Sequence, residues 1–169
     1  MEVSEIIKII DTYEVRCSRL GEIVPKEKAR KPIEEQAITQ TIFNEIVHDY
    51  TKDINSKYLE KGKECEEDSF TMLQNTLFAG KTLIIKNKER KSNGFINGEC
   101  DKNVKNSVFD IKNAYELSTF QTAELSHLYE WQLVGYSELW ETDKAFLYYT
   151  LNDMPDHLLF EEEKKMFYS

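Results

Sequence analysis

The first part of the chain carries hydrophobic positions at helical spacing. Isoleucines recur at every fourth position from Ile38 to Ile46, and proline suits the first turn of a helix. A helix is therefore predicted from Pro32 to about Tyr50. A second helix is predicted over residues 58–77, where apolar side chains again fall on one face.

The spacing then changes to that of extended strands separated by polar turns. A return to helical spacing and one more apolar run follow. The central order of elements is therefore α-β-β-β-α-β, which predicts a mixed sheet flanked by helices in an α/β (α+β) fold. The predicted strands are 82–86, 95–101, 107–112 and 144–151, with turns at 87–93 and 102–106, a helix at 125–140, and a closing helix or loose tail at 154–168.

The length and composition favour one globular domain. The chain has 169 residues, of which 40% are hydrophobic, which suffices for a single buried core. We expect an N-terminal helical part at 1–56, a catalytic core at 57–152 and a C-terminal helix or tail at 153–169. No apolar run approaches the ~20 residues that span a bilayer, and the first residues lack the apolar centre of a secretion signal. A cytoplasmic protein without membrane association is expected.

The cysteines and the charge exclude two further classes of protein. The three cysteines are far apart in the sequence and form no C-x-x-C pair, which argues against a disulfide framework or a structural zinc site. The net charge of −9 argues against a surface that binds DNA over its whole extent. It leaves room for a local basic patch, and the lysines and arginine of residues 81–91 are the candidate.

A cluster of charged residues on the predicted strands carries the candidate chemistry. Asp110 and Lys112 lie two residues apart on one strand, so both side chains leave the same face of the sheet. Taken alone, this pair is typical of a surface ion pair. Asp101, however, ends the preceding strand, and a short hairpin would bring it beside Asp110. Two neighbouring carboxylates need a cation between them, and hard oxygen ligands, with the carbonyl of Ile111 as a further donor, suit Mg²⁺ or Mn²⁺.

Such a cluster is suited to the hydrolysis of phosphodiester bonds. A divalent ion held by Asp101 and Asp110 would bind the scissile phosphate and lower the pKa of a water molecule. Lys112 beside them would orient that water or neutralise the charge of the transition state. The spacing therefore leads to the hypothesis of a metal-dependent phosphodiesterase.

Several short motifs occur in one order along the predicted frame. They are Arg16-Cys-Ser-Arg-Leu-Gly-Glu-Ile23, Gly62-Lys-Glu-Cys-Glu66, Gly98-Glu-Cys-Asp101, Asp110-Ile-Lys112 and Gln132-Leu-Val-Gly-Tyr136. In the same order, they resemble the opening segment and the G-x-x-x-E, G-x-x-D, D/E-x-K and Q-x-x-x-Y motifs of the PD-(D/E)XK nuclease superfamily, in particular of its RecB, lambda-exonuclease and YqaJ-like phage exonuclease branch. Each motif is short, but with flanking segments the resemblance covers residues 16–159.

The resemblance implies a role for each matching residue. Glu66 joins the two aspartates and the Ile111 carbonyl as a metal ligand, and Lys112 is the catalytic lysine. Gln132 positions the phosphate or the active site. Arg19 contacts a 5′ phosphate, and Tyr136 with Gln132 contacts DNA. Each of these side chains also has an ordinary interpretation: Glu66 as part of a solvated acidic helix face, Arg19 as a surface residue, and Gln132 with Tyr136 as one turn of a partly buried helix.

The function expected from the resemblance is a Mg²⁺- or Mn²⁺-dependent exonuclease that acts on duplex DNA ends in phage recombination or replication. A homotrimer and a single-strand-annealing recombinase are the partners it implies. Val24-Pro25-Lys26 stand where the family often carries Thr-Ala-Ser with a phosphate-binding serine. This departure bears on 5′-phosphate recognition and hence on exonuclease polarity. Within the enzyme class, the alternative is a structure-cutting or nicking endonuclease on the same core. A non-catalytic DNA-binding or accessory protein is the other, and the acidic net charge favours it.

Overall fold

The structure is a computed structural model, and it describes residues 3–24, 40, 42–48 and 57–159. Parts of the predicted helix at 32–50, most of the Val24-Pro25-Lys26 departure and the end of the chain lie outside these residues. The chain divides into two compact units, which are described separately. Unit 1 comprises Met1–Asp53, Asn87–Asp110 and Leu125–Phe146, and unit 2 comprises Ile54–Lys86, Ile111–Glu124 and Leu147–Ser169.

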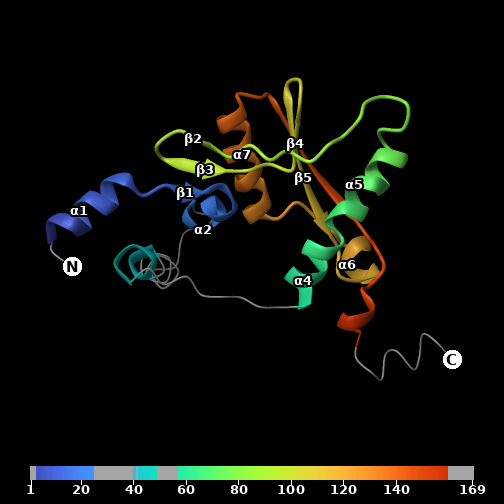
Figure 1. Cartoon of the computed structure of the whole chain (residues 1–169), viewed down its shortest axis with the longest axis horizontal. Coiled ribbons are helices and arrows are strands. Elements are labelled where there is room, and N and C mark those ends of the chain that lie inside the picture. The colour runs from blue at the N-terminus through green and yellow to red at the C-terminus, as the bar shows by residue number, and fades with distance from the viewer. Residues whose placement is uncertain (1–2, 25–39, 41, 49–56, 160–169) are drawn as a thin grey trace. The chain divides into compact units, whose positions relative to one another are not determined.

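Unit 1 contains a small three-stranded sheet and a long helix. The sheet has the order β1-β3-β2, with β1 parallel and β2 antiparallel to the central β3. Residues 42–48 are helical. The other elements, visible in Figure 1, are α1 (Val3–Thr12), β1 (Val15–Arg16), η1 (Cys17–Arg19), α2 (Leu20–Ile23), β2 (Lys91–Ser92), β3 (Ile96–Gly98), β4 (Lys102–Val104) and α7 (His127–Trp140).

Helix α7 packs closely on α2, η1 and β3 because glycines stand at the points of approach. A Cβ on Gly135 would lie 2.6 Å from Leu20 Cδ1 and 2.8 Å from Cys17 Sγ. A Cβ on Gly21 would lie 2.6 Å from the Cα of Leu128. Since carbon atoms do not approach so closely, these positions exclude any larger residue without local displacement. Ser126 caps the helix by accepting a hydrogen bond from the Tyr129 N–H.

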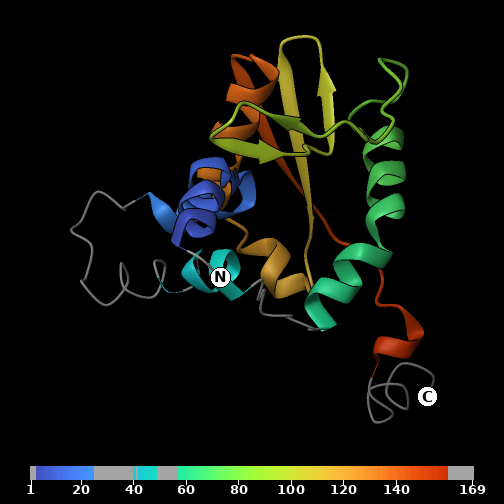
Figure 2. The ribbon, with the colours of Figure 1, turned by 60° about the vertical axis from the view of Figure 1, so that its left-hand side comes forward.

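Two strands run from unit 1 into unit 2. They are β5 (Ser107–Asn113) and β6 (Lys144–Thr150), and they form a second sheet of order β4-β5-β6. Strands β4 and β5 make an antiparallel hairpin whose turn is only Lys105 and Asn106, and Lys105 has a positive φ of 52°. Figure 2 shows this hairpin, with the much longer β5 continuing beyond β4.

Unit 2 is built from short helices around an apolar cluster. Its elements are α4 (Lys57–Glu64), α5 (Glu66–Asn75), α6 (Leu117–Gln121) and η2 (Asp156–Leu158), besides the ends of β5 and β6. The buried cluster consists of Phe70, Leu73 and Ile84, with Phe78, Ile111 and Tyr148 packed against it.

A buried polar network ties the strands of unit 2 to α5. The Ser69 hydroxyl on α5 is within hydrogen-bond distance of the Thr150 hydroxyl at 2.8 Å. It also accepts hydrogen bonds from the side chains of Asn152, at 2.8 Å, and Asn113, at 3.2 Å. Because Ser69 and Thr150 are only 1% exposed, this network fixes the ends of β5 and β6 against the helix.

The predicted mixed α/β class is confirmed, but several elements differ in detail. Strand β2 lies inside the predicted turn at 87–93, and the strand predicted at 95–101 is shortened to β3. The predicted strand at 82–86 is wrong: the Ile84 N–H donates to the side chain of Gln74 on α5, 2.8 Å away, instead of to a sheet. The predicted turn at 102–106 is wrong because β4 occupies its first three residues. The helix predicted at 58–77 is interrupted at Cys65, which separates α4 from α5.

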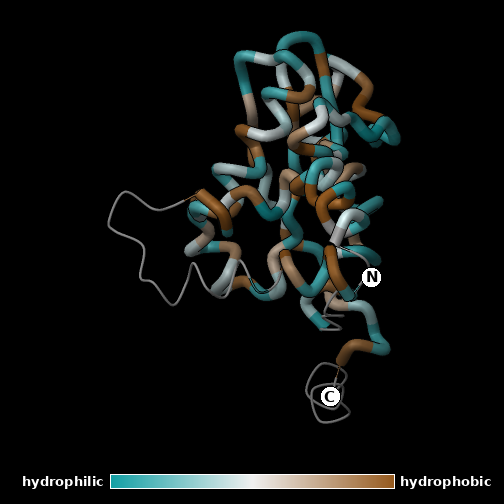
Figure 3. Tube along the Cα trace, turned by 90° about the vertical axis from the view of Figure 1, so that its left-hand side faces the viewer, coloured by the Kyte–Doolittle hydropathy of each residue, from teal (hydrophilic) through white to brown (hydrophobic). Residues whose placement is uncertain are grey.

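Short hydrophobic and hydrophilic stretches are interspersed along the chain, as the colouring of Figure 3 shows. None of the helices in the described ranges combines the length and the apolar character needed to cross a membrane.

Candidate active site

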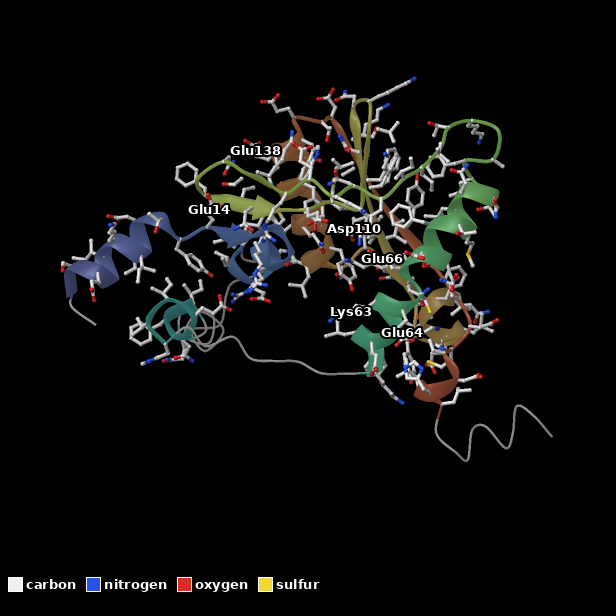
Figure 4. All side chains as sticks on the ribbon, in the orientation of Figure 1. Glu14, Lys63, Glu64, Glu66, Asp110 and Glu138 are labelled. Carbon is white, nitrogen blue, oxygen red and sulfur yellow. The ribbon has the colours of Figure 1, made fainter. Side chains whose placement is uncertain are left out.

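The β4–β5 hairpin brings two aspartates to one place in unit 1. Its register pairs Lys102 with Phe109 and Val104 with Ser107. Asp101 directly precedes β4, next to the Lys102–Phe109 pair, so a continuation of this register by one step would set Asp101 opposite Asp110 on the same face of the hairpin. Asp110, labelled in Figure 4, is 3% exposed. The register therefore predicts a second carboxylate beside the buried one.

Gln132 links Asp110 to helix α7. Its side-chain nitrogen donates to Asp110 Oδ1 at 3.4 Å and to the Tyr136 hydroxyl at 2.8 Å. Gln132 and Tyr136 lie one turn apart on α7, so both face the same side of the helix. They are 6% and 5% exposed. In the Q-x-x-x-Y motif, Gln132 thus positions the Asp110 carboxylate, and Tyr136 positions Gln132.

The charges of Asp101 and Asp110 both raise the pKa values of two neighbouring buried groups, Cys100 and Tyr136. Burial, followed by the charge of Asp101, raises the pKa of the Cys100 thiol to about 12, and Asp110 adds to the effect. Burial, followed by the charge of Asp110, also raises the pKa of Tyr136, with a smaller contribution from Asp101. Two buried groups therefore experience the negative charge of both carboxylates.

Asn87 holds the backbone that carries Asp101, and sequence reasoning missed it. Its N–H donates to the carbonyl of Asp101 at 2.7 Å, and its side chain donates to the carbonyl of Cys100 at 3.0 Å. The polar run around Asn87 predicts a turn, and no periodicity distinguishes this asparagine from its neighbours. Only the tertiary structure shows what it binds.

Cys17 is a second residue that sequence reasoning missed. It is 1% exposed, and its sulfur packs at the two glycines Gly98 and Gly135. A Cβ on Gly98 would lie 2.8 Å from Cys17 Sγ and 2.8 Å from Tyr136 Cε1. Packing therefore requires glycine at position 98 in the G-x-x-D motif, because the absence of a side chain lets β3 approach the helix that carries Gln132.

Lys112 and Ile111 follow Asp110 along β5. Ile111 packs its side chain against the apolar cluster of unit 2, which anchors the backbone of this stretch. Lys112 stands two residues from Asp110 on the same strand, so both side chains leave the same face of β5.

Glu66 lies in unit 2, as the first residue of α5 (Figure 4). Its carboxylate forms an ion pair with Lys86 Nζ at 2.7 Å, and the two side chains are 36% and 40% exposed. An exposed pair of this kind contributes little stability, about 0–1 kcal/mol. A metal ion that recruited Glu66 would compete with Lys86.

Arg19 lies in unit 1 and binds two carboxylates. Its guanidinium donates to Glu22 at 3.1 Å and to Glu45 at 2.5 Å, and its side chain is 14% exposed. Both interactions favour its charged form. A phosphate contact at Arg19 would have to replace one of these partners.

The donor set around Asp110 suits a divalent ion. Asp101 and Asp110 offer hard oxygen ligands, and β5, which carries Asp110, also offers the backbone carbonyl of the next residue, Ile111.

The fold and this arrangement define the class: the chain has the lambda-exonuclease-like fold of the PD-(D/E)XK nucleases, as predicted. In particular, it is similar to a phage-related exonuclease from Haemophilus somnus 129PT, with a TM-score of 0.77 and 25% sequence identity over 92% of this chain and 75% of that one. An alkaline exonuclease from Laribacter hongkongensis gives a TM-score of 0.64 at 15% identity, over 92% of this chain and 78% of that one.

The structure of that Laribacter enzyme in complex with dAMP gives a TM-score of 0.56 at 16% identity, over 89% of this chain and 75% of that one. No family model and no curated protein matches the sequence. The similarity therefore lies in the three-dimensional structure, and the YqaJ-like branch stays a prediction.

Proposed function

We propose that this protein is a divalent-metal-dependent deoxyribonuclease, an exonuclease of the phage and alkaline type that hydrolyses phosphodiester bonds at duplex ends. The observation that carries the proposal is the buried Asp110, to which Gln132 donates from α7; a continuation of the hairpin register by one step would add Asp101 opposite it. The fold shared with the phage-related exonuclease supports the choice of nucleic acid as substrate.

In this proposal each residue has a distinct task. Asp101, Asp110 and the Ile111 carbonyl hold a Mg²⁺ or Mn²⁺ ion, and Glu66 is the further ligand that the family resemblance suggests. The bound ion supplies Lewis acidity to the phosphate and to the attacking water. Lys112 contributes positive charge where the phosphate's negative charge grows in the transition state. Gln132 positions the Asp110 carboxylate, and Tyr136 positions Gln132.

The two proposed DNA contacts differ in how they would act. Arg19 would exchange a carboxylate partner for a 5′ phosphate. Tyr136 is 5% exposed and hydrogen-bonded inside unit 1, so its burial favours support of Gln132 over direct contact with DNA. Duplex ends, self-association as a trimer, a recombinase partner and a role in recombination or replication remain predictions of the resemblance.

The decisive experiment incubates the full chain with linear duplex DNA in the presence and absence of Mg²⁺. We expect metal-dependent release of nucleotides, lost in Asp110→Ala and retained in Asp11→Ala, which removes an exposed aspartate of α1. Gln132→Leu should lower the rate by about 10- to 100-fold, as is usual for residues that orient a ligand. Degradation by Asp110→Ala at the same rate as by the unmodified chain would refute the proposal.

The form of the DNA separates exonuclease from endonuclease action. Closed-circular duplex should resist the enzyme, and linear duplex with 5′-phosphate ends should be degraded faster than the same duplex with 5′-hydroxyl ends. Cleavage of the closed circle would favour the nicking endonuclease instead. Binding of DNA without any metal-dependent cleavage would favour the non-catalytic accessory protein.

Metal binding can be measured without activity. A ligand that binds only the native state stabilises it by about 2.7 kcal/mol at one hundred times its Kd. At about 2–4 °C per kcal/mol, Mg²⁺ should raise the melting temperature of the unmodified chain by about 5–11 °C. Asp110→Asn, which removes one of the paired charges, should show no such rise.

A further inference from the structure

An open groove of about 760 Å³ in unit 1 is lined by residues of α7 and of the segments just before and after it. Its apolar lining includes Leu125 and Val134, which are 56% and 47% exposed, and the buried Leu133. Its remaining lining is polar and acidic, and it extends to the turn that leads into β6. Two large aliphatic side chains thus stand open to solvent in a concave surface, which is typical of a binding site.

Four carboxylates line the same groove, and none of them has a cationic partner among the residues that the structure describes. Glu130, Glu138, Glu141 and Asp143 are all exposed. Asp143 interacts with the side chain of Asn106, which is neutral. The whole stretch from residue 125 to residue 143 contains no lysine or arginine. Glu138, labelled in Figure 4, belongs to the last turn of α7.

The position of these carboxylates makes their charge more unfavourable. Helix α7 has no basic residue in its last turn, and its C-cap is Glu141 in the left-handed conformation. The C-terminal end of a helix already carries a partial negative charge, so acidic residues there are repelled and cations are attracted. A bound cation would relieve both the repulsion among the carboxylates and their repulsion by the helix end.

A single metal ion does not meet this need. A site for one ion needs at least three His, Cys, Asp or Glu side chains close together. Within the described part of the chain, only Glu60, Glu64 and His157 of unit 2 form such a group. The groove carboxylates are instead spread along α7 and the turn that follows it. Glu130 and Glu141 are eleven residues apart, which corresponds to about 16 Å of helix. A complementary ligand must therefore present several cations along a comparable length.

We propose that this groove binds a lysine- or arginine-rich amphipathic helix of another protein, about three turns long. Its apolar side chains would pack on Leu125, Val134 and Leu133, and its basic side chains would pair with the four carboxylates. An amphipathic helix in a groove is a common mode of peptide recognition, and complementary charge gives it specificity. DNA is excluded as the occupant because its phosphates carry the same sign of charge as the groove. The proposal does not depend on nuclease activity.

The test uses a fluorescein-labelled 14-residue peptide probe and fluorescence anisotropy with the full chain. The probe carries leucines at helical spacing on one face and lysines elsewhere. One control peptide replaces the lysines by glutamines, and the other replaces the leucines by serines. We expect the lysine–leucine probe to bind at low salt, and both control peptides to bind at least about tenfold more weakly, which corresponds to 1.4 kcal/mol.

Variants locate the binding on the surface. Glu138→Lys combined with Glu141→Lys should weaken binding by at least about tenfold. The same charge change at the exposed Glu67 and Glu89, which lie outside the groove, should alter it by less than about twofold. Circular dichroism checks that each variant folds, and Glu138→Gln combined with Glu141→Gln provides a milder pair with the same expected direction.

Three results would overturn the proposal. Equal weakening by both charge-reversed pairs would mean general electrostatic attraction. Equal binding of the leucine probe and the serine control would mean that the apolar lining plays no part. Concentration-dependent self-association in analytical ultracentrifugation that disappears in the groove variant would mean that a second copy of this chain occupies the groove.

Discussion

Replacement of Gly98 by alanine tests how the structure supports the candidate site. The new Cβ would lie 2.8 Å from Cys17 Sγ, 2.8 Å from Tyr136 Cε1 and 3.2 Å from Cys17 Cβ. Cys17 and Tyr136 are 1% and 5% exposed, so neither can move into solvent to make room. Such overpacking costs about 1–3 kcal/mol. A loss near 2 kcal/mol would lower the melting temperature by about 4–8 °C in a chain of this length.

A double-mutant cycle measures the contact itself. Cys17→Ala removes the sulfur that the new Cβ would meet, although the contact with Tyr136 persists. The double variant Gly98→Ala/Cys17→Ala should therefore be more stable than the sum of the single changes predicts, by about 0.5–1 kcal/mol. Urea denaturation followed by circular dichroism gives the four free energies of unfolding.

Gly62→Ala is the matched control. A Cβ on Gly62 would meet no atom within 4 Å, and Gly62 lies inside helix α4. Alanine should therefore raise the free energy of unfolding by about 0.5–1 kcal/mol. If Gly98→Ala proved as stable as the unmodified chain, or if the cycle were additive, the close packing of β3 against α7 would be refuted.

Three further predictions concern the buried groups and Glu66. Lys61 is 2% exposed and donates to the carbonyls of Ala114 and Tyr115 at 3.0 and 2.9 Å, so Lys61→Met should lower the free energy of unfolding by about 1–3 kcal/mol, measured in urea. Burial raises the pKa of Cys17 to about 11 and that of Cys100 to about 12, from a usual value of 9.0. Both thiols should therefore resist alkylation at pH 8 in the native state. Above about pH 9 only the thiols of the unfolded chain ionise, so the free energy of unfolding should fall as the pH rises, by at most about 1.4 kcal/mol per thiol and pH unit. Glu66→Gln should change the free energy of unfolding by less than about 1 kcal/mol, because the ion pair of Glu66 with Lys86 is exposed. The same change should raise the Mg²⁺ concentration needed for half-maximal DNA degradation. An unchanged Mg²⁺ requirement would mean that Glu66 is not a metal ligand.

Periodicity predicted the elements whose own residues dictate their conformation. Helix α7 and strands β5 and β6 lie within two residues of the predicted ranges, because their apolar positions repeat over a long stretch. The hairpin itself was predicted, but with a five-residue turn at 102–106 that would set Asp101 opposite Ser107; the two-residue turn of the structure carries the register toward Asp110 instead. Once a hairpin forms with a two-residue turn, its register is fixed.

The errors arose where contacts from distant residues decide the conformation. The apolar run at 82–86 has the composition of a strand, but the side chain of Gln74 takes up one of its backbone donors. The roles of Asn87 and Cys17 depend on partners far along the chain, which no local pattern encodes. The ion pair between Glu66 and Lys86 joins residues twenty positions apart. Propensity cannot anticipate such contacts.

The boundary between the two compact units falls inside strand β5, between Asp110 and Ile111. The separation of Asp110 and Lys112 is consequently a property of one extended backbone, with a rise of about 3.3 Å per residue. Substitutions elsewhere in either unit leave the spacing of Asp110 and Lys112 along the strand unchanged. Insertion of one residue after Asp110 would instead turn Lys112 to the opposite face of the strand, so this short stretch tolerates substitution around it far better than any change in length.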